Sequence, residues 1–196
     1  MTVDVPEGEL SGFRVSRFTI ERDDLQNMRN AMDGRGTPPG TYTRLSQQLP
    51  NGGWRTWMSD THAEQRDHFE AAYQISSRGG QVLLGGLGLG MVLNVALHTE
   101  GVTHVDVVEI ESAVIDLVGP HYQKIAADRG VSLVIHHGDM LKIKWPRGIR
   151  WDVAWFDIWG DLNGTERADM TKLRRSYGQR TGWNDCWGRW LLDRRW

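Results

Sequence analysis

Two carboxylates follow an apolar run late in the chain and are candidates for proton transfer. Asp157 comes directly after the run 151–156, and Asp161 stands four residues further on. A carboxylate at such a position can accept a proton from an amine or hydroxyl nucleophile. Asp157 is our candidate for that role, with a helix cap or a solvated turn residue as the simpler alternative. Asp161 suits the start of the next helix equally well.

Two tryptophans, Trp155 and Trp159, flank Asp157. Alternation along a strand puts Trp155 and Asp157 on the same side. Aromatic rings there can bind substrate, by stacking on a flat molecule or by covering a cation. Packing in the core explains them at least as well.

A glycine turn stands between an apolar run and an apolar helix. Its glycines, Gly86, Gly88 and Gly90, permit a tight turn and a close approach of a ligand to the backbone. The helix that follows offers free N–H groups at its N-terminus. Glu109 ends the next apolar run, about 20 residues on, where an acid can accept hydrogen bonds from both ribose hydroxyls. Strand–helix packing and a solvated acid are the alternatives, but the agreement of all five features favours a nucleoside site.

Other reactive residues show no pattern. The seven histidines lack metal-ligand spacing, so no metal site is expected, and no nucleophile-elbow motif is present. The single cysteine, Cys186, rules out an internal disulfide and lies among tryptophans, as a packed small residue would.

The elements that would position these residues alternate between strands and helices from residue 81 onward. Repeated β-α units predict an α/β fold, a Rossmann-like parallel sheet with helices on both faces. Ligands in such sheets bind outside the carboxyl ends of the strands. The predicted strands are 81–85, 103–109, 131–135 and 151–156, and the predicted helices are 91–98, 112–128, 165–177 and 183–193.

Two of these predicted helices have features of their own. Pro120 lies inside helix 112–128 and predicts a kink or a break there. Trp183, Trp187 and Trp190 have the spacing of one helical face, which predicts a helix docked on the body or on another subunit. A stacking platform for single-stranded nucleic acid is the less favoured alternative.

The chain is expected to have two parts. Residues 1–60 read as a small β-rich appendage, and residues 61–196 as the nucleoside-binding domain with a Trp/Arg-rich helical tail. Asp23 or Asp24 can cap a short helix that ends at Met32. The other predicted elements are a strand at 13–20, a hairpin of 41–46 with 54–59, and a helix that starts after Asp60 or Thr61 and ends near 77.

Composition is that of an ordinary globular protein, with 39% hydrophobic and 24% charged residues in 196. No long uncharged apolar stretch predicts a membrane span, and the N-terminus lacks a signal-peptide pattern, so a cytoplasmic location is expected. The net charge of −2 is uneven, because residues 167–196 carry +5 and the rest −7. A basic tail can contact nucleic acid, but a solvated helix face is the more common explanation.

These residues together resemble the class I S-adenosylmethionine-dependent methyltransferases, and more narrowly the spermidine synthase branch. The resemblance covers roughly residues 41–165 and rests on the segments 82–90, 107–111, 138–139 and 151–157. It implies that the glycine turn holds the methionine moiety of S-adenosylmethionine. It implies further that Glu109, followed by Ile110, holds the ribose and that Asp139 accepts from the adenine amino group, with Met140 beside the ring. Asp157 would stand where both groups place their substrate-handling chemistry.

The chain departs from the spermidine synthase pattern at two positions. Leu89 stands where those enzymes have an aspartate in the glycine turn, and Gly160 stands where they have a second acid after the fourth strand. The chain also leaves no clear room for the antiparallel strands that finish the usual sheet, so a sheet shortened at the C-terminus is expected.

Methyl transfer to an unknown, most simply small-molecule, acceptor is therefore the first functional hypothesis. Aminopropyl transfer from decarboxylated S-adenosylmethionine to a polyamine is the second, and a nucleoside-binding protein without turnover is the third. Self-association through the Trp-rich C-terminal helix is a further expectation. No contact with a membrane is expected.

Overall fold

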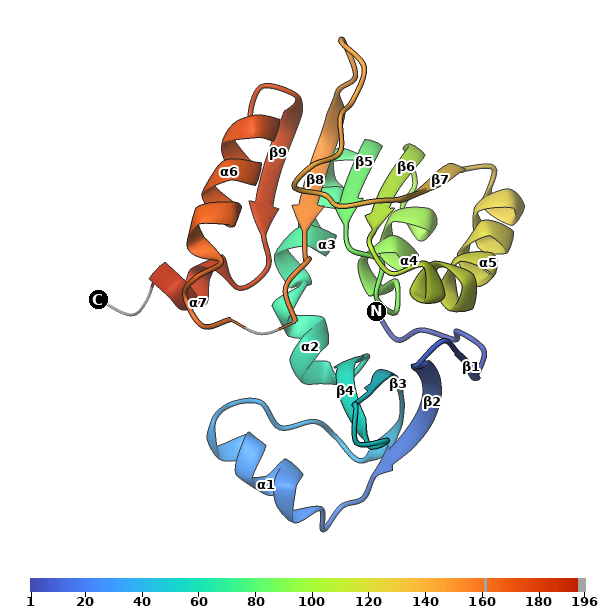
Figure 1. The fold of residues 1–196 in the computed structure, drawn as a ribbon, viewed down its shortest axis with the longest axis vertical. Helices are drawn as coiled ribbons and strands as arrows, with labels where there is room; N and C mark the ends of the chain where they lie inside the picture. The colour runs from blue at the N-terminus through green and yellow to red at the C-terminus, as the bar shows by residue number, and fades with distance from the viewer. Residues whose placement is uncertain (161, 194–196) are drawn as a thin grey trace.

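A five-stranded parallel sheet forms the larger part of the protein, and a computed structural model describes it within residues 1–160 and 162–193 (Figure 1). Its strand order is β7-β6-β5-β8-β9. The chain thus winds outward in both directions from β5, and the crevice beside β5 is where such sheets bind ligands. The strands are β5 (Gly80–Gly85), β6 (Val102–Glu109), β7 (Ser132–His137), β8 (Trp151–Phe156) and β9 (Thr181–Cys186).

Helices cover both faces of this sheet, as the alternation of strands and helices predicts. Along β5, Val82 and Leu84 pack into one hydrophobic cluster, and Leu83 packs into the other. The first cluster is covered by α3 (Phe69–Arg78), α4 (Met91–His98) and α5 (Ser112–Arg129). The second is covered by α6 (Arg167–Tyr177), which contacts the short helix α7 (Arg189–Asp193). The predicted α/β fold is therefore confirmed.

A second, antiparallel sheet lies below the carboxyl ends of the parallel strands (Figure 1). The predicted strand and hairpin at the N-terminus are confirmed, and they belong to one sheet of order β1-β2-β3-β4. Asp24 caps the helix between β2 and β3, where its side chain accepts from Asn27 N at 2.7 Å. The elements are β1 (Gly8–Leu10), β2 (Phe13–Ile20), α1 (Leu25–Met32), β3 (Gly40–Gln48) and β4 (Trp54–Ser59).

Two predicted helices differ from the structure in whether they are interrupted. The helix expected from about 61 to 77 is divided into α2 (His62–Asp67) and α3, and His68 forms the break between them. The helix containing Pro120 shows no break, since α5 runs through that residue over 18 residues.

The predicted helix 183–193 is wrong over its first half, and only its last part is helical, as α7. Residues 181–186 form β9, which extends the sheet in parallel along β8, with Trp183 beside Val153. A strand here satisfies the backbone hydrogen bonds of the open β8 edge, which local helical spacing does not reveal. Trp187 and Trp190 follow in a turn and in α7, so the three tryptophans do not share a helix face. The self-association predicted through that helix loses its structural basis.

No helix in residues 1–160 and 162–193 has the length and apolar character needed to cross a bilayer.

Candidate functional site

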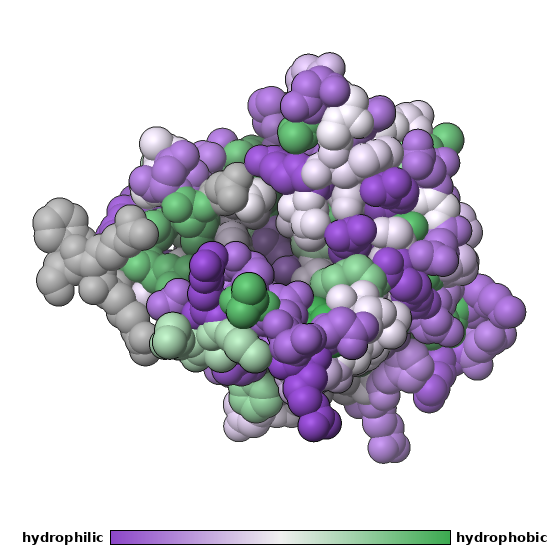
Figure 2. Space-filling model, turned by 90° about the horizontal axis from the view of Figure 1, so that it is seen from below, coloured by the Kyte–Doolittle hydropathy of each residue, from purple (hydrophilic) through white to green (hydrophobic). Residues whose placement is uncertain are grey.

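A cavity of about 490 Å³ lies at the carboxyl ends of the parallel strands, facing the N-terminal sheet. This volume is in the range of small-molecule and cofactor sites. The turns after β5, β6, β7 and β8 form one wall, and side chains of the N-terminal sheet, of α2 and of His68 form the other. Figure 2 shows the molecule hollowed on this side. The N-terminal wall includes Phe13, Leu45, Trp57 and Met58.

The glycine turn forms part of the cavity wall. Gly86 has φ +95°, and a Cβ there would lie 2.1 Å from the carbonyl oxygen of Asp157. Gly88 has φ +50°, and a Cβ there would lie 2.2 Å from Sδ of Met58. Only glycine fits these backbones and approaches. Gly90 stands outside the cavity lining, where it precedes α4 and packs on the ring of Tyr122.

Glu109 braces the glycine turn in addition to lining the cavity. It is 8% exposed, and its Oε2 accepts from Leu87 N at 2.8 Å while Oε1 accepts from Glu111 N at 2.9 Å. Oε2 also accepts from Gly88 N at 3.5 Å, so of the about four lone-pair sites of the carboxylate one on Oε1 remains for a ligand hydroxyl. Ile110, the next residue, is 59% exposed at the cavity rim.

Asp139 and Met140 line the cavity after β7. Oδ2 of Asp139 lies 2.8 Å from Nζ of Lys142, and Oδ1 accepts from Leu141 N at 2.8 Å. The hydrogen bond from Lys142 holds the pKa of Asp139 below its usual value. Met140 is buried, with its Cγ close to Gly85.

Asp157 lies deep in the cavity at the end of β8. Its backbone N–H donates to Gly85 O at 2.7 Å, which fixes it beside the start of the glycine turn. Burial raises the pKa of Asp157 to about 8, and the nearby carboxylates of Glu64, Asp67 and Glu109 act in the same direction. A carboxyl group with such a pKa is poised for proton transfer near neutral pH.

His68 is a site residue that the sequence analysis missed. It is 3% exposed, and its Nε2 lies 3.6 Å from Oδ2 of Asp157. Its Nδ1 is buried and has no hydrogen-bond partner among the described residues. Burial lowers the pKa of His68 to about 4, so the ring is neutral at pH 7. The break that aims His68 into the cavity lies inside a helical pattern, and no motif marks it.

The charged side chains that line the cavity are mostly acids. Among the described residues, seven carboxylate side chains line it, together with no lysine and one arginine, Arg35, whose guanidinium is paired with Asp67 at 2.8 Å. Such a lining attracts cations and repels phosphate. The seven are Glu64, Asp67, Glu109, Glu111, Asp139, Asp157 and Asp169.

The two predicted substrate-binding tryptophans both line the cavity. Trp155 is 3% exposed, its ring stacks on that of Trp183 at 6.1 Å and 8°, and its Nε1 has no partner among the described residues. Trp159 is half-buried at the rim. Asp161, the second predicted catalytic acid, lies outside the described residues.

Comparison with known proteins finds similarity at the level of structure alone. No family model and no curated protein sequence matches the chain. Among solved structures, the methyltransferase domain of bacterial CtHen1-C is similar, at 13% identity and a TM-score of 0.46 over 60% of each chain. The CcbJ methyltransferase from Streptomyces caelestis follows at 21% identity and 0.45, over 59% of this chain and 45% of that one.

Protein arginine methyltransferase 10 from Arabidopsis thaliana has 17% identity and a TM-score of 0.42, over 59% of this chain and 36% of that one. The chain thus spans 60% or less of each of these three proteins. All three are methyltransferases, and all three TM-scores lie below 0.5.

Proposed function

We propose that this protein is an S-adenosylmethionine-dependent methyltransferase that acts on an amine. One observation carries the proposal: a single cavity joins the glycine turn and Glu109 to Asp157, whose carboxyl group is tuned for proton transfer near pH 7. S-adenosylmethionine supplies an electrophilic methyl group on a sulfonium centre.

The residues present fit the nucleoside part of this donor. Gly86 and Gly88 both line the cavity, and without a side chain they let a ligand approach the backbone closely. Glu109 and Asp139 provide acceptors for ribose hydroxyls and an adenine amino group. Trp155 Nε1 is a buried donor without a partner in the described part of the chain, and a ligand can satisfy it.

An amine acceptor fits the charge of the cavity. An amine reaches the cavity mostly as ammonium at neutral pH, and carboxylates of the lining attract it. It must lose a proton to become a nucleophile. The carboxylate of Asp157 accepts that proton at Oδ, and the ammonium itself lowers the pKa of Asp157 by stabilising the ionised form. The neutral ring of His68 lies beside the Asp157 carboxyl group, with Nε2 3.6 Å from Oδ2.

Aminopropyl transfer is a second candidate, and the charges around the cavity favour it. The carboxylate of S-adenosylmethionine needs a cation or free N–H groups, yet Arg35 is already paired with Asp67. Several N–H groups of the glycine turn are also engaged: Leu87 N donates to Glu109, and Leu89 N to Sδ of Met58 at 3.1 Å. Decarboxylated S-adenosylmethionine does not have this requirement.

Calorimetric titration with both donors and with the demethylated product tests these proposals. Methyl transfer predicts binding of S-adenosylmethionine and its demethylated product, and a large loss of affinity in Glu109→Ala. Glu109→Gln keeps an acceptor oxygen for Leu87 N and serves as the matched control for the turn. Preference for the decarboxylated donor would favour aminopropyl transfer. Binding without product in an amine screen would indicate a non-catalytic protein, and no binding at all would refute the donor site.

A further inference from the structure

Two nine-residue segments on the α6 side of the sheet carry only positive charge. Segment 142–150, which leads from β7 to β8, and segment 172–180 in and after α6 together contain eight Lys/Arg and no Asp or Glu. The eight are Lys142, Lys144, Arg147, Arg150, Lys172, Arg174, Arg175 and Arg180.

Most of this charge is not neutralised by the protein. Lys142 pairs with Asp139 at 2.8 Å, and Arg174 with Asp185 at 3.3 Å. The other six form no ion pair with any residue in the described part of the chain. Unpaired cations at this density have to be neutralised by counterions or by an anionic ligand.

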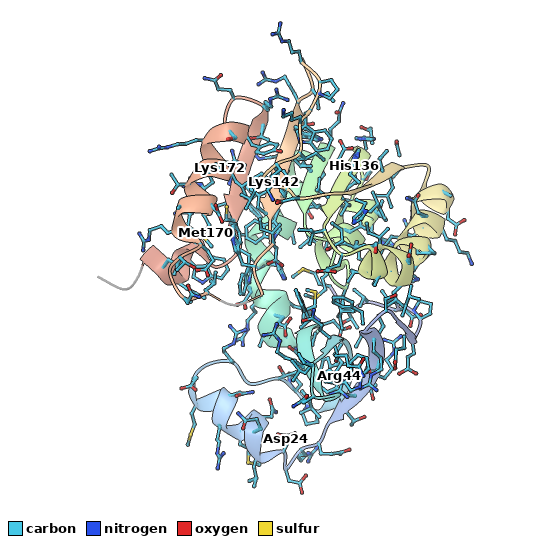
Figure 3. All side chains as sticks on the ribbon, viewed as in Figure 1. Asp24, Arg44, His136, Lys142, Met170 and Lys172 are labelled. Atoms are coloured by element: carbon cyan, nitrogen blue, oxygen red, sulfur yellow. The ribbon has the colours of Figure 1, made fainter. Side chains whose placement is uncertain are left out.

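The two segments face each other across a groove of about 370 Å³. Lys144, Lys172 and Arg180 line it from both sides. Backbone carbonyls hold two of these side chains in place, since Lys172 Nζ donates to Leu141 O at 3.2 Å and an Nη of Arg180 donates to Pro146 O at 3.4 Å. Figure 3 labels Lys172 and Lys142 close to each other on the α6 side of the sheet.

The base of the groove is rigid and aromatic. Trp145 Nε1 donates to the hydroxyl of Tyr177 at 2.8 Å, which ties segment 142–150 to α6. The ring of Trp145 also packs edge-on against Trp151 at 4.9 Å. These contacts hold the backbone that carries the cations in one conformation. Less conformational entropy is therefore lost when the cations bind an anionic ligand.

We propose that this basic groove binds the phosphate backbone of a nucleic acid. Positive charges spread along two segments match a row of phosphates better than a single small anion, for which cations converge on one point. None of the exposed large hydrophobic side chains of the described residues lies in either segment. This favours a purely electrostatic contact with phosphates, and the vesicle measurement below distinguishes nucleic acid from anionic lipid.

The basic groove adjoins the acidic cavity, although the two carry opposite charge. Met140 and Leu141 line both. A polyanion is therefore held on the α6 side, while the acidic lining excludes phosphates from the cavity itself. The proposal does not depend on methyl transfer.

Fluorescence anisotropy with labelled single-stranded DNA and RNA oligonucleotides, over a series of KCl concentrations, tests the groove. Wild-type protein is expected to bind both, with affinity that falls steeply with salt. The variant K144E/K172E/R180E should bind roughly tenfold more weakly or worse, and the magnitude of its log–log salt slope should fall by about 2. The neutral variant K144Q/K172Q/R180Q removes the same three charges and should also bind more weakly than the wild type. It replaces the charge-reversed variant in this test if that variant does not fold.

The matched control is K124E/R129E, which reverses two exposed cations on α5. It should bind like the wild type, and all variants should keep the Tm of the wild type, which shows that they are folded. The proposal is overturned if the wild type shows no binding at the lowest salt, or if the α5 control loses as much affinity as the groove variant. Binding to anionic phospholipid vesicles in the absence of oligonucleotide binding would also overturn it.

Discussion

Nε2 of His68 lies 3.6 Å from Oδ2 of Asp157, so the break between α2 and α3 meets the end of β8 inside the cavity. Burial shifts the two pKa values in opposite directions, to about 4 for His68 and to about 8 for Asp157. At pH 7 the ring and the carboxyl group are therefore both uncharged. The carboxyl group of Asp157 therefore carries a proton at pH 7, and we expect a cation in the cavity to favour its ionised form.

The free energy of unfolding should depend on pH, because the folded protein binds this proton more tightly than the unfolded chain does. Asp157 keeps it up to a pKa of about 8 in the folded protein, but loses it near its ordinary value of 3.8 when unfolded. The resulting stabilisation is complete below about pH 4 and is lost progressively as pH rises from there to 8. The titration of His68 cancels in a comparison with Asp157→Asn, because both proteins contain it.

Relative to Asp157→Asn, the wild type should therefore lose about 1.4 kcal/mol per pH unit between pH 6.5 and 8. Thermal unfolding should show the gap in Tm changing by about 3–6 °C per unit. Asp128→Asn, an exposed acid on α5, is the control and should give a constant gap. A constant gap for Asp157→Asn as well would show that the carboxyl group is ionised across this range.

Binding of a cation should release the proton of Asp157. At pH 7 the sulfonium of S-adenosylmethionine favours the ionised carboxylate, so up to one proton should leave per ligand bound. Calorimetry in buffers of different ionisation enthalpy measures this number directly. Asp157→Asn should bind without proton release. Equal heats in all buffers for the wild type would mean that Asp157 does not respond to the ligand.

Replacing Gly86 should disrupt the cavity wall. In Gly86→Ala the new methyl group meets the carbonyl oxygen of Asp157, and the backbone has φ +95°. The clash and the strain together should cost about 2 kcal/mol or more and weaken donor binding strongly. Gly52→Ala also has a positive φ, +81°, but no neighbour within 4 Å, so it should cost only about 1 kcal/mol and leave binding intact. Equal effects of the two substitutions on binding would contradict the assigned wall.

The hydroxyl of Tyr122 should matter for the glycine turn. It is buried and donates to Leu89 O at 2.8 Å. Tyr122→Phe leaves that carbonyl without its partner, which should cost about 1–3 kcal/mol and reduce donor affinity. Tyr73→Phe, where the ring is 57% exposed, should change neither the unfolding free energy nor the affinity. Urea unfolding and calorimetry measure the two quantities, and a neutral Tyr122→Phe would mean that the turn is held without this bond.

Local sequence pattern was sufficient for the core of the fold. Short apolar runs bounded by glycine and acid predicted β5, β6, β7 and β8 within a few residues, because buried parallel strands need continuous apolar side chains. Gly86, Gly88 and Glu109 were predicted from their spacing, and the structure places all three in the cavity wall. The sequence by itself thus determined the parallel sheet and the neighbourhood of the site.

Tertiary structure decided the rest. Residues 181–186 became a strand because the β8 edge supplied hydrogen-bond partners, and no local pattern contains that edge. Glu109 braces the turn, and His68 faces Asp157, because segments far apart in sequence pack together. The acidity of the cavity and the basic groove also arise only when charges from many elements share one surface. Such properties depend on distances in space, whereas helical and strand periodicity reports only distances along the chain.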